Sequence, residues 1–489
     1  MKTKIILHLV SIFLPVVLLA QTDADALRFS QTNMTGTARS TSMAGAFGAI
    51  GADFSSLSIN PAGLAIYRKP EITMSPAVFS KKTNSSFFGN RSLDEKYGFN
   101  FGNLGLIATA EQQNYAKHGW KFLNFGVGYN RLSSYSSHST YAGVNPDNSY
   151  LDYFLQNINT PQGTKSDDLN PFFENLAYQT FLLNPKDSID TLHYSSEIPF
   201  GGALQRRNAT SSGAMREIAV SIAGNYKDRL FLGATLGFDF ISYTENSSYE
   251  ESDKLDTIPR FKSFAMNQDL TTDGQGFNLK LGMIFKATDW LRLGAAVTTP
   301  TSFEMSDNYR SRLKSEFDNG DKHDFQAKGD FTYELTTPLK ATASAAVIIQ
   351  KQAVISVDYE LMNYAEMNFG SSSDAFFDIN NSIQNKYTQA NNIRIGGEWK
   401  FENFSFRGGY AMLGSPFRSG VSYPGADFSR TCYTAGIGLR DERYFLDFAY
   451  SITLSNEFYR QYSLKSELVE GAKSSVSAQN FIMTLGFKF

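Results

Sequence analysis

The chain ends in a run of residues that alternates between two kinds of side chain. Between Gln479 and Phe489, large apolar residues take every second position and polar or small residues lie between them, with Ile482 the one exception. A period of two indicates a β-strand, because successive side chains point to opposite faces. The length suits one tilted crossing of a bilayer, and five large apolar groups on one face are unusual in a soluble sheet. This segment therefore predicts a membrane-spanning strand.

The same alternation recurs at many other places in the chain. It is found at 230–240, 277–286, 291–298, 355–361, 393–401, 404–412, 431–440 and 443–454. The faces opposite the apolar ones carry the charged residues Asp239, Lys280, Arg292, Asp358, Glu360, Arg394, Glu398, Arg407 and Arg440. Such charges belong in a water-filled or gated interior, and the apolar faces belong against lipid. The pattern therefore predicts an all-β transmembrane β-barrel.

Short and long connections alternate between the expected strands. In outer-membrane barrels the short connections are periplasmic turns and the long ones are outside loops. Tight connections occur at 227–228, 288–289, 350–351, 402–403 and 441–442, and long polar ones at 85–96, 134–212, 246–274, 306–322, 369–390, 414–429 and 455–475. The resulting fourteen antiparallel strands are 71–84, 97–110, 119–133, 213–226, 229–245, 275–287, 290–305, 323–349, 352–368, 391–401, 404–413, 430–440, 443–454 and 478–489. Pro338 cannot donate to a strand ladder, so it predicts a bulge or kink in the eighth strand.

The start of the chain and its composition indicate where such a barrel would reside. Residues 1–20 combine early lysines with a short apolar run, as a signal peptide does, and Pro15 makes an uncleaved anchor the weaker alternative. A signal peptide followed by a barrel predicts the outer membrane of a Gram-negative bacterium. Cys432 is the single cysteine, which excludes an internal disulfide. The net charge of −3 argues against nucleic-acid binding, which needs a concentrated basic face.

Residues 21–67 do not follow the strand pattern. Gly45, Gly48 and Gly51 recur every three residues there, a spacing that permits close backbone packing inside a barrel. The spacing matches neither of the usual phosphate-binding loops. We therefore expect a signal peptide at 1–20, an N-terminal plug or hatch at 21–67, and the barrel at 68–489.

Several segments resemble the FadL/TodX family of outer-membrane transporters. Asn60-Pro61-Ala62-Gly63-Leu64 follows a Gly/Ala-rich stretch, as the Asn-Pro-Ala motif does in the hatch of that family. Residues 274–300 resemble the family's sixth and seventh strands, and residues 392–410 resemble its tenth and eleventh. The C-terminal Phe489 is similar to the signal that such barrels present to the barrel-assembly machinery. The resemblance covers nearly the whole mature chain.

This resemblance implies passive uptake of hydrophobic small molecules, such as long-chain fatty acids. Outside loops would capture the ligand, a lumenal pocket would bind it, and a shift of the hatch at Asn60, Pro61 and Ala62 would gate its release. The ligand would leave sideways into outer-membrane lipid through a kinked third strand, where Gly126 and Gly128 permit a kink. Such a route replaces one unfavourable transfer through the polar leaflet with several small steps.

Two groups of apolar residues are candidates for contact with ligand. The long loop 134–212 contains two helical patterns, whose capture candidates are Phe154, Leu155, Phe172, Phe173 and Leu176. The alternative is that these residues simply pack on one another or on the barrel rim. On the lumenal face, Ile241, Ile284 and Met362 are apolar exceptions among charges, as is Ile482. They either line a pocket or pack against the hatch.

No arrangement of residues indicates catalysis, a cofactor or a metal site. His138 and His193 permit a haem or metal role, although histidines in outside loops are more often solvated. The lumenal carboxylates are more often partners of lumenal arginines than acid–base pairs. A membrane-embedded hydrolase needs a Ser/His or Asp/His cluster at the rim, and the sequence contains none that is recognisable. The remaining rival is a barrel component or shuttle of a protein-secretion system, which the sequence does not separate from a transporter.

Overall fold

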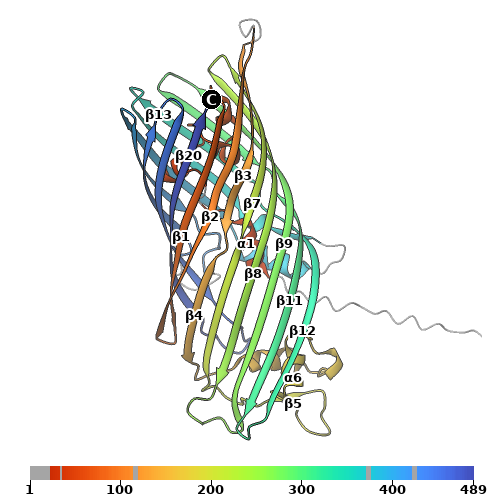
Figure 1. Ribbon diagram of the computed structural model, residues 1–489. Coiled ribbons are helices and arrows are strands. Elements are labelled where there is room, and N and C mark those ends of the chain that lie inside the picture. Colours follow the sequence, from red (N-terminus) through yellow and green to blue (C-terminus); the bar gives the residue numbers. More distant parts are fainter. Residues whose placement is uncertain (1–21, 34–35, 114–118, 371–375, 421–426) are drawn as a thin grey trace, which may run out of the picture.

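The computed structural model describes residues 22–33, 36–113, 119–370, 376–420 and 427–489, so the expected signal peptide at 1–20 lies outside the described residues. These residues form a closed antiparallel β-barrel with helical segments in its interior and at one of its ends (Figure 1). The barrel closes where β20 (Ala472–Lys488) pairs with β1 (Glu71–Phe87). The strand that ends the chain therefore lies beside the first one.

The barrel sheet contains eighteen strand segments that make fourteen spans. Four spans consist of two segments each: β3/β4, β10/β11, β12/β13 and β14/β15. After β1, the segments in chain order are β2 (Asn90–Glu111), β3 (Trp120–Ser134), β4 (Ser137–Val144), β7 (Leu204–Tyr226), β8 (Leu230–Ser252), β9 (Phe261–Lys286), β10 (Leu291–Thr298), β11 (Ser302–Phe317), β12 (Lys322–Thr336), β13 (Lys340–Ile349), β14 (Ala353–Asn363), β15 (Asn368–Gly370), β16 (Gln389–Phe401), β17 (Phe404–Leu413), β18 (Arg430–Arg440) and β19 (Tyr444–Tyr459), before β20. A separate hairpin is formed by β5 (Leu183–Pro185) and β6 (Tyr194–Ser196).

The helical segments are short. They are α1 (Asp23–Ser30), α2 (Ala38–Ser42), α3 (Ser56–Ile59), η1 (Pro61–Ile66), α5 (Tyr150–Ile158), η2 (Ser166–Asp168), α6 (Glu174–Gln179), η3 (Tyr364–Glu366) and α7 (Phe377–Lys386). Among the described residues, no helix has both the length and the apolar character needed to cross a bilayer.

Side-chain alternation orients the barrel wall as expected. On β20, Phe481 is 48% exposed on the outer face, whereas Thr484 is fully buried on the inner face. Exposed aromatic residues follow the turn end of the barrel at Trp120, Trp290, Trp399, Phe404, Tyr444 and Phe489, and a second group lies further along the strands at Tyr97, Phe99, Phe238, Phe277, Tyr359, Tyr410 and Tyr433. Two aromatic girdles with an apolar band between them are typical of outer-membrane barrels. They define the part of the wall that faces lipid.

The strands continue beyond this band on the loop side. On β9, the outward residues change from Phe277 and Phe285 within the band to Gln275, Asp273 and Thr271 beyond it. The predicted number and order of spans are confirmed, but the predicted loops at 85–96, 246–274 and 306–322 are largely strand, and strands also extend into both ends of 455–475. These segments still alternate, but their outward side chains meet water, so they lack the apolar face by which a membrane strand is recognised.

Two of the four interrupted spans break at prolines, a third breaks at η3 between β14 and β15, and the fourth is the third span of the barrel. The break between β12 and β13 contains Pro338, as predicted, and the break between β10 and β11 contains Pro300. The third span breaks between β3 and β4, and it lies at the centre of the candidate site described below. The predicted kink at Gly126 and Gly128 is wrong, because both residues pair regularly with β2 and β7.

Candidate functional site

The described residues of the N-terminal segment, 22–33 and 36–67, lie inside the barrel, and several residues of the second range approach wall glycines (Figure 1). A β-carbon added to Gly282 would lie 1.9 Å from Asn60 Oδ1, and one added to Gly294 would lie 2.3 Å from the carbonyl oxygen of Gly48. An added β-carbon would also lie within 3 Å of this segment at the wall glycines Gly102, Gly105, Gly128, Gly233, Gly396, Gly409 and Gly436. Glycine permits this close approach because it carries no side chain.

Asn60 and Pro61 form the junction between α3 and η1. Asn60 Oδ1 accepts a hydrogen bond from the Ala62 amide at 3.1 Å, and Pro61 takes the first position of η1, where its missing N–H costs nothing. The Asn60 amide group donates to the carbonyl oxygens of Gly48 (2.6 Å) and of Met283 on β9 (3.2 Å). Asn60 is 1% exposed. This motif therefore both caps a turn and attaches the segment to the wall.

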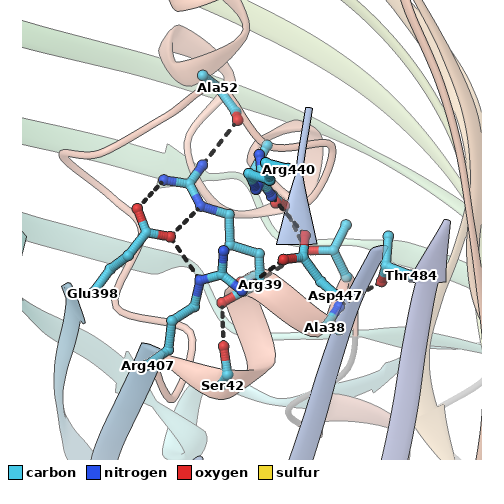
Figure 2. Close-up of polar contacts among 12 residues, drawn as sticks. Ala38, Arg39, Ser42, Ala52, Glu398, Arg407, Arg440, Asp447 and Thr484 are labelled. Atoms are coloured by element: carbon cyan, nitrogen blue, oxygen red, sulfur yellow. Dashed lines mark hydrogen bonds and ion pairs between the residues drawn. The ribbon is translucent and has the colours of Figure 1, made fainter. Parts of the chain in front are cut away.

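A chain of buried charges joins the N-terminal segment to the opposite wall (Figure 2). Arg39 donates to both carboxylate oxygens of Glu398, at 2.8 and 3.0 Å, and to the carbonyl oxygen of Ala52. Arg407 donates to Glu398 at 2.6 Å and to Asp447 at 2.7 Å. Arg440 donates to the second oxygen of Asp447. Each carboxylate is thus shared by two guanidinium groups.

Further polar contacts hold residues 36–67 at other points. Asp358 accepts hydrogen bonds from the amides of Phe47 and Gly48, at 3.0 and 2.9 Å. Ser58 donates to Glu217, which also pairs with Lys280. Some of the charged residues predicted to face the lumen therefore form ion pairs within the wall, as expected. Others, such as Asp358, bind the N-terminal segment.

The wall opens beside the break in the third span. The β2–β3 ladder ends at the pair Asn103–Asn130, and no ladder joins the rest of β2 to β4 among the described residues. Both β3 and β4 remain paired with β7 on their other side. This geometry leaves a slit in the wall, flanked by residues 95–102 and 131–139.

Side-chain contacts close the outer end of this slit. Asp94 of β2 accepts hydrogen bonds from the amide and hydroxyl of Thr140 on β4, at 2.7 and 3.1 Å. The ring of Tyr141 lies 4.6 Å from that of Phe87, measured between centroids. The slit is therefore bounded by a regular ladder at one end and by this clasp at the other.

A cavity of about 490 Å³, which we call the side cavity, lies along the slit. Its lining includes Asn100 and Gly102 of β2, and Ser133 and Ser134 of β3. Its aromatic and aliphatic members include Leu27, Phe79, Tyr135, Tyr141, Leu413, Phe417, Phe428, Phe458, Tyr459, Val476 and Ile482. Its charged members are the five cations Arg28, Lys81, Arg131, Arg207 and Arg430, and the single carboxylate Glu457.

A second cavity of about 160 Å³, the central cavity, lies further inside the barrel. Its charged lining is mixed, with the cations Arg131, Lys280, Lys340 and Arg394 and the carboxylates Asp239, Asp358 and Glu360. Asn33 and Arg131 line both cavities. The Asn33 amide donates to the Leu132 carbonyl oxygen at 2.9 Å, and its side chain donates to Ser133 Oγ at 3.1 Å. The N-terminal segment thus contacts the unpaired edge of β3 and separates the cavities.

The structure distributes the predicted pocket residues among different surroundings. Met362 lines the central cavity. Ile241 packs among Phe29, Tyr243 and Phe303 instead, and Ile284 packs against residues of the N-terminal segment such as Leu57. The cations of the side cavity were not predicted. Lys81, Arg131 and Arg430 lie on predicted strands, whereas Arg207 lies on a strand extension and Arg28 on α1. The alternation pattern does not show that these positions converge on one cavity.

The predicted capture residues are brought together in a compact roof over the loop end of the barrel. Phe154 and Leu176 are fully buried, Phe172 is 7% exposed, and Leu155 and Phe173 pack partly buried against them. The roof also includes Tyr249, Phe261 and Phe264 from the extended strands and Tyr462 from the 460–471 connection. These side chains therefore pack on one another, which is the alternative given above. None of them lines the side cavity or the central cavity.

The histidines make local contacts. His193 is hydrogen-bonded to Asp190, which raises the pKa of His193, and to the Thr160 carbonyl oxygen. His138 contacts Thr210 and Asp94. His118 lies outside the described residues. No group of three metal-ligating side chains occurs in the described part of the chain.

Comparisons with known proteins agree on the fold. No family model matches the sequence, and no curated protein matches it either. The structure of the toluene transporter TodX from P. putida superposes with a TM-score of 0.57 at 14% identity, covering 94% of this chain and 99% of the other. A Pseudomonas aeruginosa FadL homologue gives 0.58 at 12% identity over 94% and 99%, and the Ralstonia pickettii toluene transporter TbuX gives 0.54 at 16% over the same shares. The chain therefore has the fold of the FadL/TodX barrels, with fourteen strands and short N-terminal helices inside.

Proposed function

We propose that this protein is a non-enzymatic outer-membrane channel for passive uptake of hydrophobic small molecules that carry an anionic group, such as long-chain fatty acids. The observation that carries the proposal is the position of the side cavity along the slit between β2 and β3/β4. A ligand in this cavity has an opening toward lipid at its side, and it need not pass the tightly docked residues 36–67. The similar structures are described as transporters of toluene or as a FadL homologue, which supports the broader class of channels for hydrophobic compounds.

The lining of the side cavity favours an amphiphile over a neutral hydrocarbon. Its aromatic and aliphatic side chains suit an acyl chain, because burying apolar surface is favourable. Three of its five cations, Arg28, Lys81 and Arg207, already have carboxylate partners. Arg430 forms no ion pair among the described residues, although it donates to Asn33 Oδ1 at 3.4 Å. A carboxylate head group would supply an anionic partner for Arg430 through charge-assisted hydrogen bonds. Benzene-like ligands favour cavities lined by apolar groups alone.

In this proposal, residues 27–33 form the movable part of the hatch. Asn33 occupies the β3 edge at the slit through two hydrogen bonds, whereas residues 36–67 are held by wall glycines and buried ion pairs. Withdrawal of Asn33 from Leu132 and Ser133 would connect the central and side cavities. The gate therefore lies N-terminal to Asn60, Pro61 and Ala62, and that motif serves as its anchor.

Uptake of a fluorescent long-chain fatty acid tests the path, in Gram-negative cells that lack their own transporter for it. Ser134→Trp places a large ring in the side cavity, and uptake should fall several-fold. Val127→Trp adds the same ring to the lipid-facing side of β3 and should leave uptake unchanged, since Val127 is 44% exposed there. Equal uptake by Ser134→Trp and wild type, at equal amounts of folded barrel, would contradict the lateral path.

A disulfide tests the gate. The side chains of Asn33 and Ser133 are in hydrogen-bond contact, so N33C/S133C is placed to form a bond that fixes residue 33 on β3. Uptake should fall in oxidised cells and return after reduction, and neither single variant should respond. Unchanged uptake with the bond formed would show that this segment does not gate the path.

The nature of the ligand requires a separate measurement. Lipid extracted from the purified barrel should contain a stoichiometric acid, and R131Q/R430Q should weaken its binding by about tenfold, the scale of one charge-assisted hydrogen bond. K322Q, which removes an exposed cation at a distant turn, is the control. A protein that co-purifies with an empty barrel would instead support the secretion component or shuttle.

A further inference from the structure

A cavity of about 200 Å³ lies at the turn end of the barrel, between the N-terminal segment and the wall. Its lining contains the cations Arg39, Arg292, Lys351 and Lys400, and one carboxylate, Glu398. The turn that carries Lys351 joins β13 to β14, at the same end of the barrel as Phe489, so the cavity faces the periplasm in the orientation expected for such barrels. It is separate from the side and central cavities.

The single carboxylate does not balance these cations. Glu398 accepts hydrogen bonds from Arg39 and also from Arg407, which lies outside the cavity lining, so two guanidinium groups already share its charge. Lys400 Nζ is 4.0 Å from the same carboxylate. Arg292 forms no ion pair among the described residues, although its Nη1 donates to the Ile50 carbonyl oxygen at 2.9 Å. The cavity therefore carries an excess of positive charge.

Arg292 also has an unused donor. Its Nε is buried and has no hydrogen-bond partner in the described part of the chain. A buried donor without a partner is costly, because it has lost its hydrogen bonds to water. An oxygen of a bound anion would satisfy this donor and would offset the like charges of the neighbouring side chains.

We propose that this cavity is an anion-binding site that accepts a carboxylate or an inorganic oxyanion from the periplasmic side. Arg292 provides the buried donor, and the exposed Lys351 and Lys400 attract the anion at the rim. Apolar side chains of Ile50, Ile66 and Ile348 form the remaining wall and leave room for a short carbon chain. Because Arg39 lines the same cavity, the bound anion lies beside the ion pair that docks the N-terminal segment.

The site is tested with the full-length barrel in a non-ionic detergent at low ionic strength, by calorimetric titration with inorganic phosphate and with hexanoate. Wild type should bind at least one of them saturably. Saturable binding of phosphate but not of hexanoate would identify the ligand as a free oxyanion. Tighter binding of hexanoate would identify it as a carboxylate with an apolar body. Arg292→Gln should weaken binding about tenfold. The control K322Q should bind as wild type does.

K351Q/K400Q leaves the buried lining of the cavity intact. It replaces Arg292→Gln in the binding test if that variant does not fold, as judged by heat-modifiable migration on gels. It should weaken binding several-fold and make the remaining binding less sensitive to salt. The proposal is overturned if neither anion binds saturably to wild type. It is also overturned if folded Arg292→Gln, or the double variant in its place, binds as tightly as wild type. These measurements involve no uptake, so their failure is distinct from failure of the proposed transport path.

Discussion

Arg39 on α2 forms a buried two-point ion pair with Glu398 on β16, from which it is separated by 359 residues in the chain. The two side chains are 9% and 2% exposed. The pair therefore fixes the start of the docked N-terminal segment to the wall at a place that water scarcely reaches. Its contribution depends on both partners, because one charge left alone in such a place is unfavourable.

Glu398→Gln should destabilise the barrel strongly. The substitution retains the shape of the side chain but leaves Arg39 and Arg407 without a shared carboxylate, and breaking a buried pair in this way costs about 3–5 kcal/mol. The free energy of unfolding in urea, measured in detergent, checks this value. Asp269→Asn breaks the exposed pair with Arg310 and should cost less than about 1 kcal/mol. Equal losses for both variants would contradict the special role of the buried pair.

Gly282→Ala should loosen the N-terminal segment without changing the fold of the wall. The added methyl group would lie 1.9 Å from Asn60 Oδ1, which caps η1, and would clash with it. Limited proteolysis within residues 36–67 should become faster, and N60A in the same chain should partly relieve the clash. Gly408→Ala is the matched control, because the nearest atom to its added carbon is 3.9 Å away. Unchanged proteolysis of Gly282→Ala would show that the segment adjusts freely.

The sequence was sufficient to predict the number and order of the spans, since alternation is a local property. The expected strands 404–413 and 430–440 agree with β17 and β18 to the residue. The wall faces of Arg394, Arg407 and Arg440 were predicted by the same rule, and these residues do form lumenal ion pairs.

The slit and the partners of the N-terminal segment could not be predicted from local patterns. Gly126 and Gly128 indicated a kink in the third strand, but they provide room for Leu57 and Phe54 of the N-terminal segment. The actual break follows Ser134, where no proline or glycine marks it. Likewise, no local pattern shows that Arg39 meets Glu398, because that contact depends on the closed register of the whole sheet.

Because the predicted capture residues are buried in the roof, their substitution is expected to affect its stability. Phe154→Ala should unfold the roof locally, since removing a buried phenylalanine side chain costs about 3–5 kcal/mol. Amide hydrogen exchange should rise across α5 and α6 and should remain unchanged in β16 to β20. Gln162→Ala, at an exposed position just after α5, is the control. If Phe154→Ala instead lowered ligand affinity with no change in exchange, direct capture would be the better explanation.

Glu174 makes the roof sensitive to pH. Burial raises the pKa of this carboxyl group above its usual value, and the hydrogen bond from Asn157 only partly opposes the shift. The folded roof therefore holds the proton more tightly than the unfolded loop does. This contribution to stability is fully present below the unfolded pKa of about 4.3 and is lost as pH rises through the folded value.

Glu174→Gln should accordingly slow amide exchange in α6 at pH 7 and reduce the difference between pH 7 and pH 5. The intrinsic pH dependence of exchange is removed by comparison with α7 in the same sample. Exchange in Glu174→Gln that is faster than in wild type at pH 7 would contradict the expected sign.

Phe489 links the structure of the closing strand to its assembly. Its amide donates to the Pro70 carbonyl oxygen at 3.2 Å, its ring stacks on Phe487 with centroids 5.9 Å apart, and 58% of its surface remains exposed. An exposed ring with so few contacts contributes little to the folded barrel, so its expected role is recognition by the barrel-assembly machinery. Deletion of Phe489 should lower the amount of inserted, heat-modifiable barrel in cells and should leave the urea midpoint of the inserted fraction nearly unchanged. Phe487→Ala, which keeps the terminal ring, should insert better than the deletion. Normal insertion without Phe489 would show that assembly does not depend on this residue.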